Sequence, residues 1–398
     1  MNKVPKLRFK EFSGDWEEKR LKEVSSIYDG THQTPNYVEN GIKFVSVEDI
    51  KNIENTQKYI SEEDFNKNFK IKPQINDILM TRITAGIIGD TSIIKNNNPL
   101  GYYVSLALIR KKDNLEVNFL NQYINSRFFK LELNKRIIHV AFPKKINLGD
   151  IGECKINLPS LQEQEKIGNF LSNIDKKISI TEEKLELFKE YKKGIMQKIF
   201  NQKLRFKDSN GNDYPEWEEK EVGELLVESK ILPEKQELEK RITVKLNLKG
   251  IEKRKITPEE KEGATTNYLR KEGQFIYGKQ NFHKGAFGII PKELDGYQSS
   301  SDIPSFDFIR NLIIGKYFYY YFSQKNVYEN LENISTGTGS KRIQPKVFFN
   351  VKLDIPCLEE QQKIANFLSS IDNKIDNLAT ELEDLKEFKK GLLQQMFI

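Results

Sequence analysis

Residues 158–200 of the chain read LPSLQEQEKIGNFLSNIDKKISITEEKLELFKEYKKGIMQKIF, and residues 355–397 read IPCLEEQQKIANFLSSIDNKIDNLATELEDLKEFKKGLLQQMF. The two stretches align without a gap at an offset of 197 residues and share 23 identities in 43 positions. Agreement at this level between distant parts of one chain indicates a tandem duplication.

The duplication extends beyond these stretches. The segment 6–10 (KLRFK) recurs as 203–207, and 16–19 (WEEK) recurs as 217–220 after a four-residue insertion. Within the less similar segments, Ile78–Arg82 aligns with Phe275–Lys279, and Lys144–Ile146 aligns with Lys341–Ile343. Each copy therefore consists of a short basic-aromatic opener, a variable domain, a proline turn and a long helix. Because the second helix ends where another opener would follow, we expect the first opener to pack there and close a pseudo-twofold ring.

Both similar stretches carry a heptad pattern of apolar residues, which is typical of helices that pack on each other. Pro159 and Pro356 are expected in the first helical turns, and each helix should be roughly 60 Å long. The cyclic repeat favours an antiparallel pair. Lys192 and Lys389 occupy matching seam positions, which indicates that something other than a purely apolar two-helix core lies there. Gly194 and Gly391 within the helices predict a close backbone approach. The expected interface residues are Ile167, Leu171, Ile174, Ile178, Leu185, Ile195, Ile364, Leu368, Ile371, Ile375, Leu382 and Leu392.

The pattern leaves the role of the helix pair open. One possibility is a coiled coil that only stabilises this chain; the other is a rod that also sets the spacing of the domains and docks partners. The expected organisation is an opener and first domain (1–157), a central helix (158–201), an opener and second domain (202–354) and a C-terminal helix (355–398).

Composition restricts the class of protein. The 398 residues are 37% hydrophobic and 31% charged, as in soluble globular proteins. There is neither an apolar run long enough to span a membrane nor an apolar segment of the kind found in secretory signals, so a cytoplasmic location is expected. Cys154 and Cys357 are expected to be reduced and buried.

The net charge of +6 is distributed unevenly. Residues 20–157 and 221–354 each carry +4, whereas residues 158–200 carry +1 and residues 355–398 carry −3. The variable domains, rather than the helices, are thus expected to meet phosphate.

Each variable domain is predicted to have a mixed α/β fold. In the first, strands are expected at 42–47, 78–81, 91–94 and 103–109, with a helix at 117–133. In the second, strands are expected at 242–248, 274–277, 286–290 and 306–308, with a helix at 313–333. The overall fold class is α/β (α+β), with two globular domains joined by two long antiparallel helices.

Polar and basic loops between these elements are candidates for reading DNA. Arg and Lys bond guanine edges or phosphates, Asn pairs with adenine, and hydroxyls and backbone amides hold phosphates. The loop Thr336–Arg342 and its counterpart near Lys144 are the strongest candidates. The candidate DNA-binding residues are Thr31, His32, Thr34, Arg82, Thr84, His139, Lys144, Lys145, Lys279, Asn281, His283, Lys284, Thr338, Ser340, Lys341 and Arg342.

Motifs for catalysis are missing from the sequence. Asn98-Pro99-Leu100-Gly101 lacks the second proline of an adenine methyltransferase motif, and there is no Walker A motif. The three histidines, at 32, 139 and 283, have no ligand spacing. No catalytic residue and no metal site are therefore predicted, and the chain reads as a binding protein.

These features resemble the specificity (S) subunit of type I restriction-modification systems over essentially the whole chain. The resemblance rests on the opener Pro5–Phe9 with Trp16-Glu17, the turns 158–164 and 355–361 of pattern [LI]PxLxEQ, and the paired helices. Gly285–Gly288 and Gly337-x-Gly339 add to it.

The resemblance implies a non-catalytic subunit in which two target recognition domains each read one half of an asymmetric bipartite DNA site. The helices would fix the gap and dock two modification (methyltransferase) subunits for adenine-N6 methylation, and restriction subunits would join for translocation and cleavage. S-adenosylmethionine, ATP and Mg²⁺ would belong to those partners, with no cofactor bound here. Base flipping would likewise occur in the partner.

Two other hypotheses remain at this point. One is a stand-alone bivalent DNA-binding regulator, whose coiled coil would serve only for dimerisation or for spacing the domains. Such a protein would bind a specific DNA sequence without a partner. A fragment of a fused methyltransferase-nuclease is a third possibility, which the complete cyclic repeat disfavours.

Overall fold

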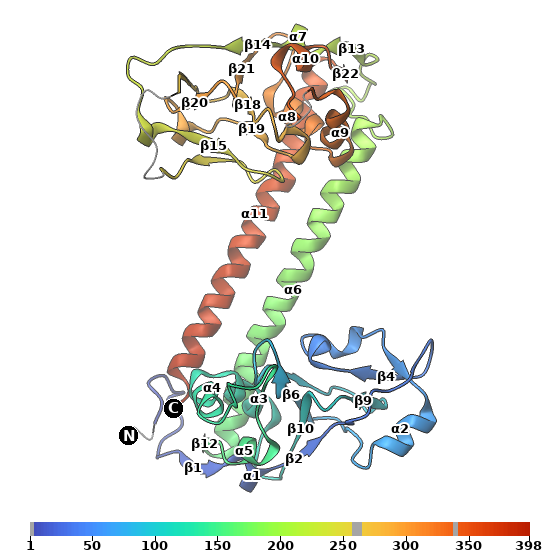
Figure 1. Cartoon of the computed structure of the whole chain (residues 1–398), viewed down its shortest axis with the longest axis vertical. Helices are drawn as coiled ribbons and strands as arrows, with labels where there is room; N and C mark the ends of the chain where they lie inside the picture. The colour runs from blue at the N-terminus through green and yellow to red at the C-terminus, as the bar shows by residue number, and fades with distance from the viewer. Residues whose placement is uncertain (1–3, 257–264, 337–340) are drawn as a thin grey trace. The chain divides into compact units, whose positions relative to one another are not determined.

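The computed structural model describes residues 4–256, 265–336 and 341–398 (Figure 1). The chain forms two compact units, and the first consists of Met1–Glu183 with Thr380–Ile398. The second unit is Lys184–Ala379. Each unit therefore contains one end of helix α6 (Leu161–Phe200) and the opposite end of helix α11 (Leu358–Gln395). The boundary between the two units falls within both long helices. The four parts expected from the sequence repeat instead keep each helix whole.

The first unit is built on an antiparallel four-stranded sheet in the order β2-β10-β6-β8. A smaller sheet, β3-β5-β4-β9, has its own apolar cluster around Phe44 and Tyr102. The opener joins this unit through β1, which pairs with β12 just before α6. The strands are β1 (Glu17–Arg20), β2 (Ser25–Asp29), β3 (Tyr37–Val38), β4 (Ile42–Val45), β5 (Tyr59–Ile60), β6 (Ile78–Thr81), β7 (Ile83–Thr84), β8 (Thr91–Ile93), β9 (Leu100–Tyr102), β10 (Leu106–Lys111), β11 (Lys144–Lys145) and β12 (Lys155–Leu158).

Helices cover the larger sheet of the first unit. The predicted helix 117–133 is interrupted, because Ser126 adopts an extended conformation and its hydroxyl accepts a hydrogen bond from Phe129 N. The helices are α1 (Leu21–Val24), α2 (Glu62–Asn68), α3 (Val117–Asn125), α4 (Arg127–Asn134) and α5 (Leu148–Gly152), with short 3₁₀ turns at Val47–Asp49 and Ile53–Asn55.

The second unit repeats this plan around the sheet β14-β21-β18-β19. Its strands are β13 (Glu218–Glu221), β14 (Leu226–Ser229), β15 (Ile242–Val244), β16 (Ile251–Lys253), β17 (Asn267–Leu269), β18 (Phe275–Tyr277), β19 (Phe287–Ile289), β20 (Gln298–Ser300), β21 (Ser305–Phe308) and β22 (Lys352–Ile355). Its helices are α7 (Val222–Leu225), α8 (Gly315–Phe322), α9 (Lys325–Asn330) and α10 (Pro345–Phe349), with 3₁₀ turns at Leu238–Lys240, Phe282–Lys284, Lys292–Leu294 and Leu331–Ile334. The predicted helix 313–333 is thus divided into three short helices.

The predicted packing of the first opener against the end of the second helix is confirmed. Leu7 N donates to Gln395 O at 2.9 Å, and the Trp16 and Phe397 rings meet edge to face. The same backbone hydrogen bond joins Leu204 N to Lys198 O at 3.0 Å, where the first helix runs directly into the second opener. The non-covalent junction of the first unit therefore reproduces the covalent junction of the second.

The helices α6 and α11 run antiparallel, as predicted. In the first unit Asp175 and Glu182 of α6 pair with Lys389 and Lys386 of α11, so the partner number falls as the α6 number rises. Seven of the twelve expected interface residues are buried, namely Ile167, Leu171, Leu185, Ile364, Leu368, Ile371 and Leu392; Ile174, Ile178, Ile195, Ile375 and Leu382 are half-buried. Nine of the twelve, all except Ile178, Leu185 and Leu382, share a cluster with domain side chains, so the seam is not a closed two-helix core.

Two details of the helix predictions are wrong. Pro159 and Pro356 precede the helices, which begin at Leu161 and Leu358. A side chain at Gly194 or Gly391 would meet nothing within 4 Å, so neither glycine marks a close approach. The close approach lies instead at Gly168, where an added Cβ would lie 2.6 Å from Phe119 N at the start of α3.

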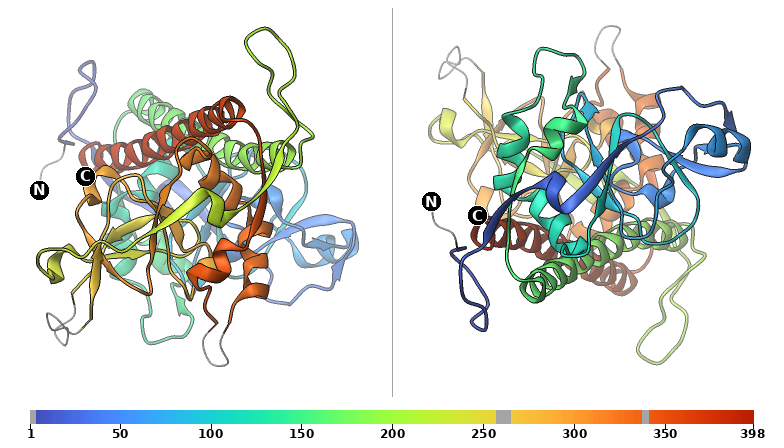
Figure 2. Two further views of the ribbon diagram at one scale, coloured as in Figure 1. Left: turned by 90° about the horizontal axis from the view of Figure 1, so that it is seen from above. Right: turned by 90° about the horizontal axis from the view of Figure 1, so that it is seen from below.

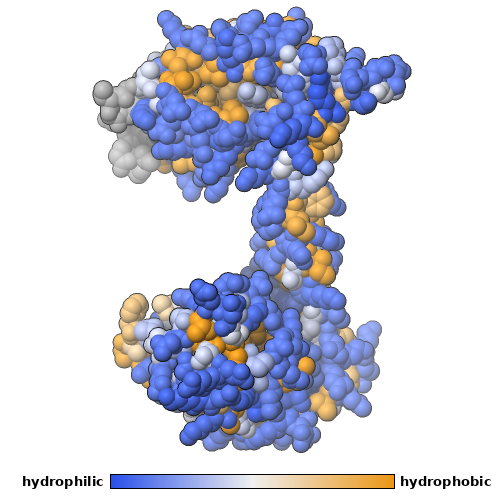
Figure 3. All heavy atoms as spheres, turned by 90° about the vertical axis from the view of Figure 1, so that its right-hand side faces the viewer, coloured by the Kyte–Doolittle hydropathy of each residue, from blue (hydrophilic) through white to orange (hydrophobic). Residues whose placement is uncertain are grey.

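The two thiols differ in environment. Cys154 is buried, as predicted, whereas Cys357 is only half-buried. Hydrophilic residues make up most of the surface drawn in Figure 3, with apolar patches between them. Within the described residues, no helix combines the length and apolar character needed to cross a lipid bilayer.

Candidate nucleic-acid interface

Asp29, at the end of β2, connects two of the candidate loops in the first unit. Its carboxylate accepts a hydrogen bond from Arg82 Nη2 at 3.0 Å, and its other oxygen lies 2.8 Å from His32 Nε2. Gly30 N also donates to this carboxylate, at 3.0 Å. The loop 30–34 and the segment that begins at Arg82 are thereby held next to each other, although 50 residues of sequence separate them.

A short ribbon brings the remaining candidates of this unit together. Strand β7 pairs antiparallel with β11, so that Thr84 lies opposite Lys144 and Ile83 opposite Lys145. The chain between them turns back through an exposed loop that contains His139, closed by the bridge between Ile138 and Lys145. We call residues 83–87 and 138–145 the β7–β11 ribbon. Thr84, His139, Lys144 and Lys145, from two distant parts of the sequence, therefore occupy a single structural element.

Two predicted contact residues of the first unit are buried. Arg82 is 7% exposed, and its guanidinium bonds Asp29 and the carbonyl of Ile146. Thr31 is 8% exposed, and its backbone bonds Tyr102 and Val104. The Arg82 side chain cannot reach DNA without breaking its contacts, and the Thr31 side chain is buried. We therefore correct the assignment: Arg82 and Thr31 position the loops, whereas His32 and Thr34 are exposed on them.

The second unit repeats the backbone hydrogen bond at the base of the ribbon, where the ribbon joins its domain, with different side chains. Ile343 N donates to Lys279 O at 2.9 Å, as Ile146 N donates to Arg82 O at 3.0 Å in the first unit. Thr336 and Arg342 form a backbone bridge that closes the loop between them. The predicted residues Thr338 and Ser340 lie outside the described residues.

Four candidates of the second unit line one cavity of about 670 Å³. They are Asn281, His283, Lys284 and Lys341, and they are joined there by Gln280, Glu329 and Glu332. Asn281 lies at the start of the 3₁₀ turn Phe282–Lys284, which Gly285 ends with a φ of 73°. A left-handed conformation of this kind favours glycine. The turn thus sets Asn281, His283 and Lys284 around the cavity.

Two cations of this cavity and its loop, Lys341 and Arg342, are paired with acids at the surface. Lys341 Nζ lies 2.9 Å from Glu332 Oε1, and Arg342 Nη1 lies 3.0 Å from Asp302 Oδ1. The hydrogen bond from Lys341 lowers the pKa of the Glu332 carboxyl. Exposed pairs of this kind contribute only about 0–1 kcal/mol. Phosphate oxygens can therefore replace the carboxylates as partners at little cost.

The family of the chain follows from comparison with known proteins. The family model described as "Type I restriction modification DNA specificity domain" matches twice, at residues 13–189 and 214–387. The chain belongs to this family. The specificity domain is thus present in two copies, in agreement with the repeat. As a specificity subunit, the chain is a DNA-recognition component of a restriction-modification system and not its catalyst.

Relatives in Methanocaldococcus jannaschii are consistent with the family. The proposed type I restriction enzyme MjaX specificity subunit is 25% identical over 98% of this chain and 94% of its own length. The type I restriction enzyme MjaVIII specificity subunit is 27% identical, and the match covers 60% of each protein.

Solved structures share the fold of the chain. The type I S subunit from M. genitalium has a TM-score of 0.64 at 14% identity, with 99% of both chains covered. A chain from a structure of the assembly and conformational transition of the type I restriction-modification system has a TM-score of 0.52 at 15% identity and covers 96% of this chain. The fold of the chain is thus known from experiment.

Sequence reasoning missed the acids that organise both sites. Asp29 and Asp302 hold the candidate arginines Arg82 and Arg342, yet each is one carboxylate among 58. No repeat signal marks them, because the specificity domains align poorly in this region. Only the strand pairing that brings distant loops together reveals their role.

Proposed function

We propose that each specificity domain reads one half of an asymmetric bipartite site in double-stranded DNA. The supporting observation is that both units use one backbone arrangement to present different side chains. Thr84 stands where the second unit has Asn281, and Lys144-Lys145 stand where it has Lys341-Arg342. A retained scaffold with altered reading residues is suited to recognising two different base sequences.

We further propose that α6 and α11 set the gap between the half-sites and dock two adenine-N6 methyltransferase subunits. Tyr191 of α6 and Phe388 of α11 occupy equivalent positions of the repeat and are 50% and 55% exposed. Large aromatic side chains at the surface are typical of protein interfaces. One such residue in each unit is consistent with two equivalent binding sites.

The remaining parts of the complex belong to its partners. S-adenosylmethionine would be bound by the methyltransferase subunits, and ATP and Mg²⁺ by restriction subunits that join for cleavage. This chain would supply the sequence recognition that positions them.

An exchange of residues 221–354 for another specificity domain tests the proposal. Methylated motifs in host DNA would be mapped by sequencing with the original and the exchanged chain. We expect one half of the motif to change and the other half and the gap to persist. A change in both halves would contradict independent reading. Tight, specific binding by the isolated chain would favour a stand-alone regulator.

The docking surface has a test of its own. Tyr191→Ser and Phe388→Ser should each remove about one methyltransferase from the purified complex, and the double variant should remove both. Tyr37→Ser, at a 54% exposed tyrosine of β3, is the control and should keep both subunits. Two subunits bound to the double variant would place the docking surface elsewhere.

A further inference from the structure

The end of the β7–β11 ribbon exposes apolar side chains. Val140 and Phe142 are 98% and 93% exposed, more than any other large apolar residue that the structure describes. Ile87, which follows β7 at the same end, is 64% exposed. In both views of Figure 2 the teal loop at this point extends away from the rest of its unit. Exposed apolar residues that gather in one patch, unlike single ones, mark an interaction site.

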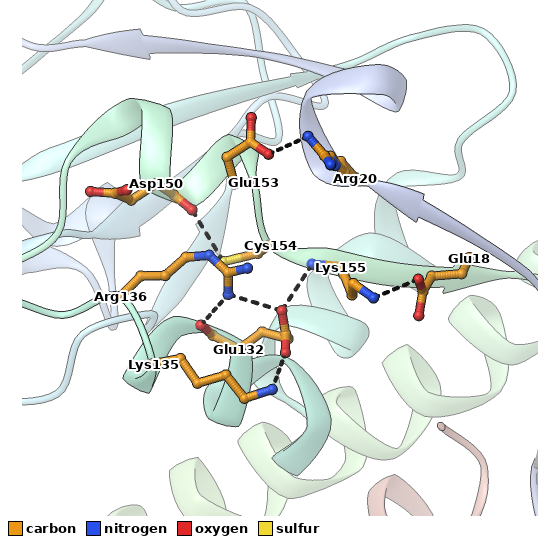
Figure 4. Close-up of polar contacts among 9 residues, drawn as sticks. All are labelled: Glu18, Arg20, Glu132, Lys135, Arg136, Asp150, Glu153, Cys154 and Lys155. Carbon is orange, nitrogen blue, oxygen red and sulfur yellow. Dashed lines mark hydrogen bonds and ion pairs between the residues drawn. The ribbon is translucent and has the colours of Figure 1, made fainter. Parts of the chain in front are cut away.

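The base of the ribbon is firmly held. Ile146, directly after β11, is fully buried. Arg136, two residues before Ile138, donates to both the carbonyl and the carboxylate of Glu132, each at 2.9 Å (Figure 4). Glu132 also accepts from the backbone N of Lys155 in β12. The apolar tip is thus presented by an anchored hairpin rather than by a loose chain end.

Cations surround the tip. Lys144 and Lys145 are exposed, and within the described part of the chain neither side chain forms an ion pair. The equivalent Lys341 and Arg342 are both paired with acids. Unpaired lysines beside exposed apolar groups match a ligand that offers phosphates next to an apolar interior, and stacked base pairs in duplex DNA have this composition.

We propose that the tip of the β7–β11 ribbon is a wedge that inserts Phe142 between two stacked base pairs of the first half-site. Val140 would pack beside the ring, and Lys144 and Lys145 would bond the flanking phosphates. Two-stranded ribbons fit DNA grooves, and apolar side chains inserted between base steps unstack and bend the duplex. The inference rests on the proposed reading of DNA by this domain and adds a distortion of the site to it.

The repeat favours DNA over a methyltransferase as the partner of this tip. At the offset of 197 residues, Val140 and Phe142 correspond to Gly337 and Gly339. A surface that docks one of two identical partners should recur in both copies, as Tyr191 and Phe388 do. A surface that meets two different half-sites need not recur. The wedge is therefore a property of the first domain alone.

The test uses the complete methyltransferase complex and a duplex that carries its methylation motif. 2-Aminopurine, whose fluorescence rises when it is unstacked, would replace one base at a time along both half-sites. We expect the fluorescence to rise several-fold at one base step of the first half-site. In the second half-site we expect no rise that depends on Phe142. Phe142→Ala should abolish this rise in fluorescence and weaken DNA binding about tenfold. Phe142→Trp should keep both the rise and the affinity of the unaltered complex.

One control variant and three diagnostic outcomes separate the possible explanations. Leu131→Ala, at a 48% exposed leucine of α4, should change neither fluorescence nor affinity. If the unaltered complex does not bind its motif, the proposed function fails and not the wedge alone. If it binds but shows no unstacking in the first half-site, or if Phe142→Ala binds equally well, the wedge is wrong. Loss of a methyltransferase from the Phe142→Ala complex without DNA would identify the tip as a protein-docking site instead.

Discussion

Lys389 Nζ of α11 lies 2.5 Å from Asp175 Oδ1 of α6, and the second unit repeats this pair at 2.5 Å between Lys192 and Asp372. The second carboxylate oxygen of each aspartate is held by its domain. Gln122 Nε2 donates to Asp175 Oδ2 at 2.6 Å, and Tyr320 OH donates to Asp372 Oδ2 at 2.7 Å. Each aspartate therefore ties three elements together, which explains why a lysine occupies a seam position in both helices.

Removal of one of these lysines should have a small but measurable effect. We expect Lys389→Ala to lower the free energy of unfolding by about 0.5–1 kcal/mol, because the pair is partly exposed and Gln122 still satisfies one oxygen of Asp175. Chemical denaturation of the purified chain measures the change. Lys386→Ala is the control, since its pair with Glu182 is half-exposed on both sides and should contribute almost nothing. An equal loss in both variants would show that Lys389 has no special role in the seam.

A larger effect is expected where the opener meets the helix. Arg8 Nε and Nη2 bond the two oxygens of Glu163 at 2.7 and 2.8 Å, and Glu163 is 1% exposed. Arg8→Ala would leave this carboxylate buried without its cation, at a cost of about 3–5 kcal/mol. The melting temperature should fall by several degrees.

Arg20→Ala is the matched control for this prediction. Arg20 pairs with Glu153 at 2.7 Å, but both side chains lie well in the solvent, at 54% and 37% exposed. Its loss should cost less than about 1 kcal/mol. Similar melting temperatures for the two variants would mean that the opener is not fixed by its ion pair.

The sequence specified the repeat, the helix pair and the ring closure because each leaves a local or periodic signal. The heptad positions Ile167 and Leu171 and the copied opener at Leu7 and Leu204 required no tertiary information. Strand β6 was also predicted at its observed bounds, since Ile78–Thr81 is a short, buried apolar run. In contrast, the ends of the predicted helices 117–133 and 313–333 depended on capping residues such as Ser126, whose pattern is weak.

The candidate site was only partly accessible from sequence. Residue chemistry selected Lys144 and Lys341 correctly as exposed cations on equivalent loops. It could not show that Arg82 points into the interior toward Asp29, because burial of a charged residue depends on a partner from another strand. The apolar tip at Phe142 was overlooked for the opposite reason: a phenylalanine is ordinarily assigned to the core, and its 93% exposure is a property of the folded ribbon.

Lys341→Ala combined with Arg342→Ala should weaken DNA binding by the assembled complex and reduce its dependence on salt. If both cations contact phosphate, the slope of log K against log salt concentration should fall by about 1.8. Binding would be measured at several salt concentrations with a duplex that carries the motif. Lys325→Ala, on α9, removes an exposed lysine that already pairs with Glu329 and serves as the control. An unchanged slope would place the loop away from DNA.

The two cysteines should differ in reactivity. Burial raises the pKa of the Cys154 thiol to about 12, so very little nucleophilic thiolate exists at pH 8. Cys357 is half-buried at the start of α11. Iodoacetamide should therefore modify Cys357 first, and mass spectrometry should detect one adduct on the native chain and two after unfolding in guanidinium. Rapid modification of Cys154 in the native chain would contradict its burial.

The length of the helices should determine the gap that the complex accepts. Four residues inserted into both α6, after Glu183, and α11, after Ala379, lengthen each helix by about 6 Å. Since base pairs rise by about 3.4 Å, the tolerated gap should grow by at most about two base pairs. An insertion into one helix alone would instead shift one ion pair, Lys389–Asp175 or Lys192–Asp372, out of register, so it should destabilise the chain rather than change the gap. Methylation of duplexes with graded gaps distinguishes these cases, and an unchanged gap with both insertions would show that the helices do not measure the site.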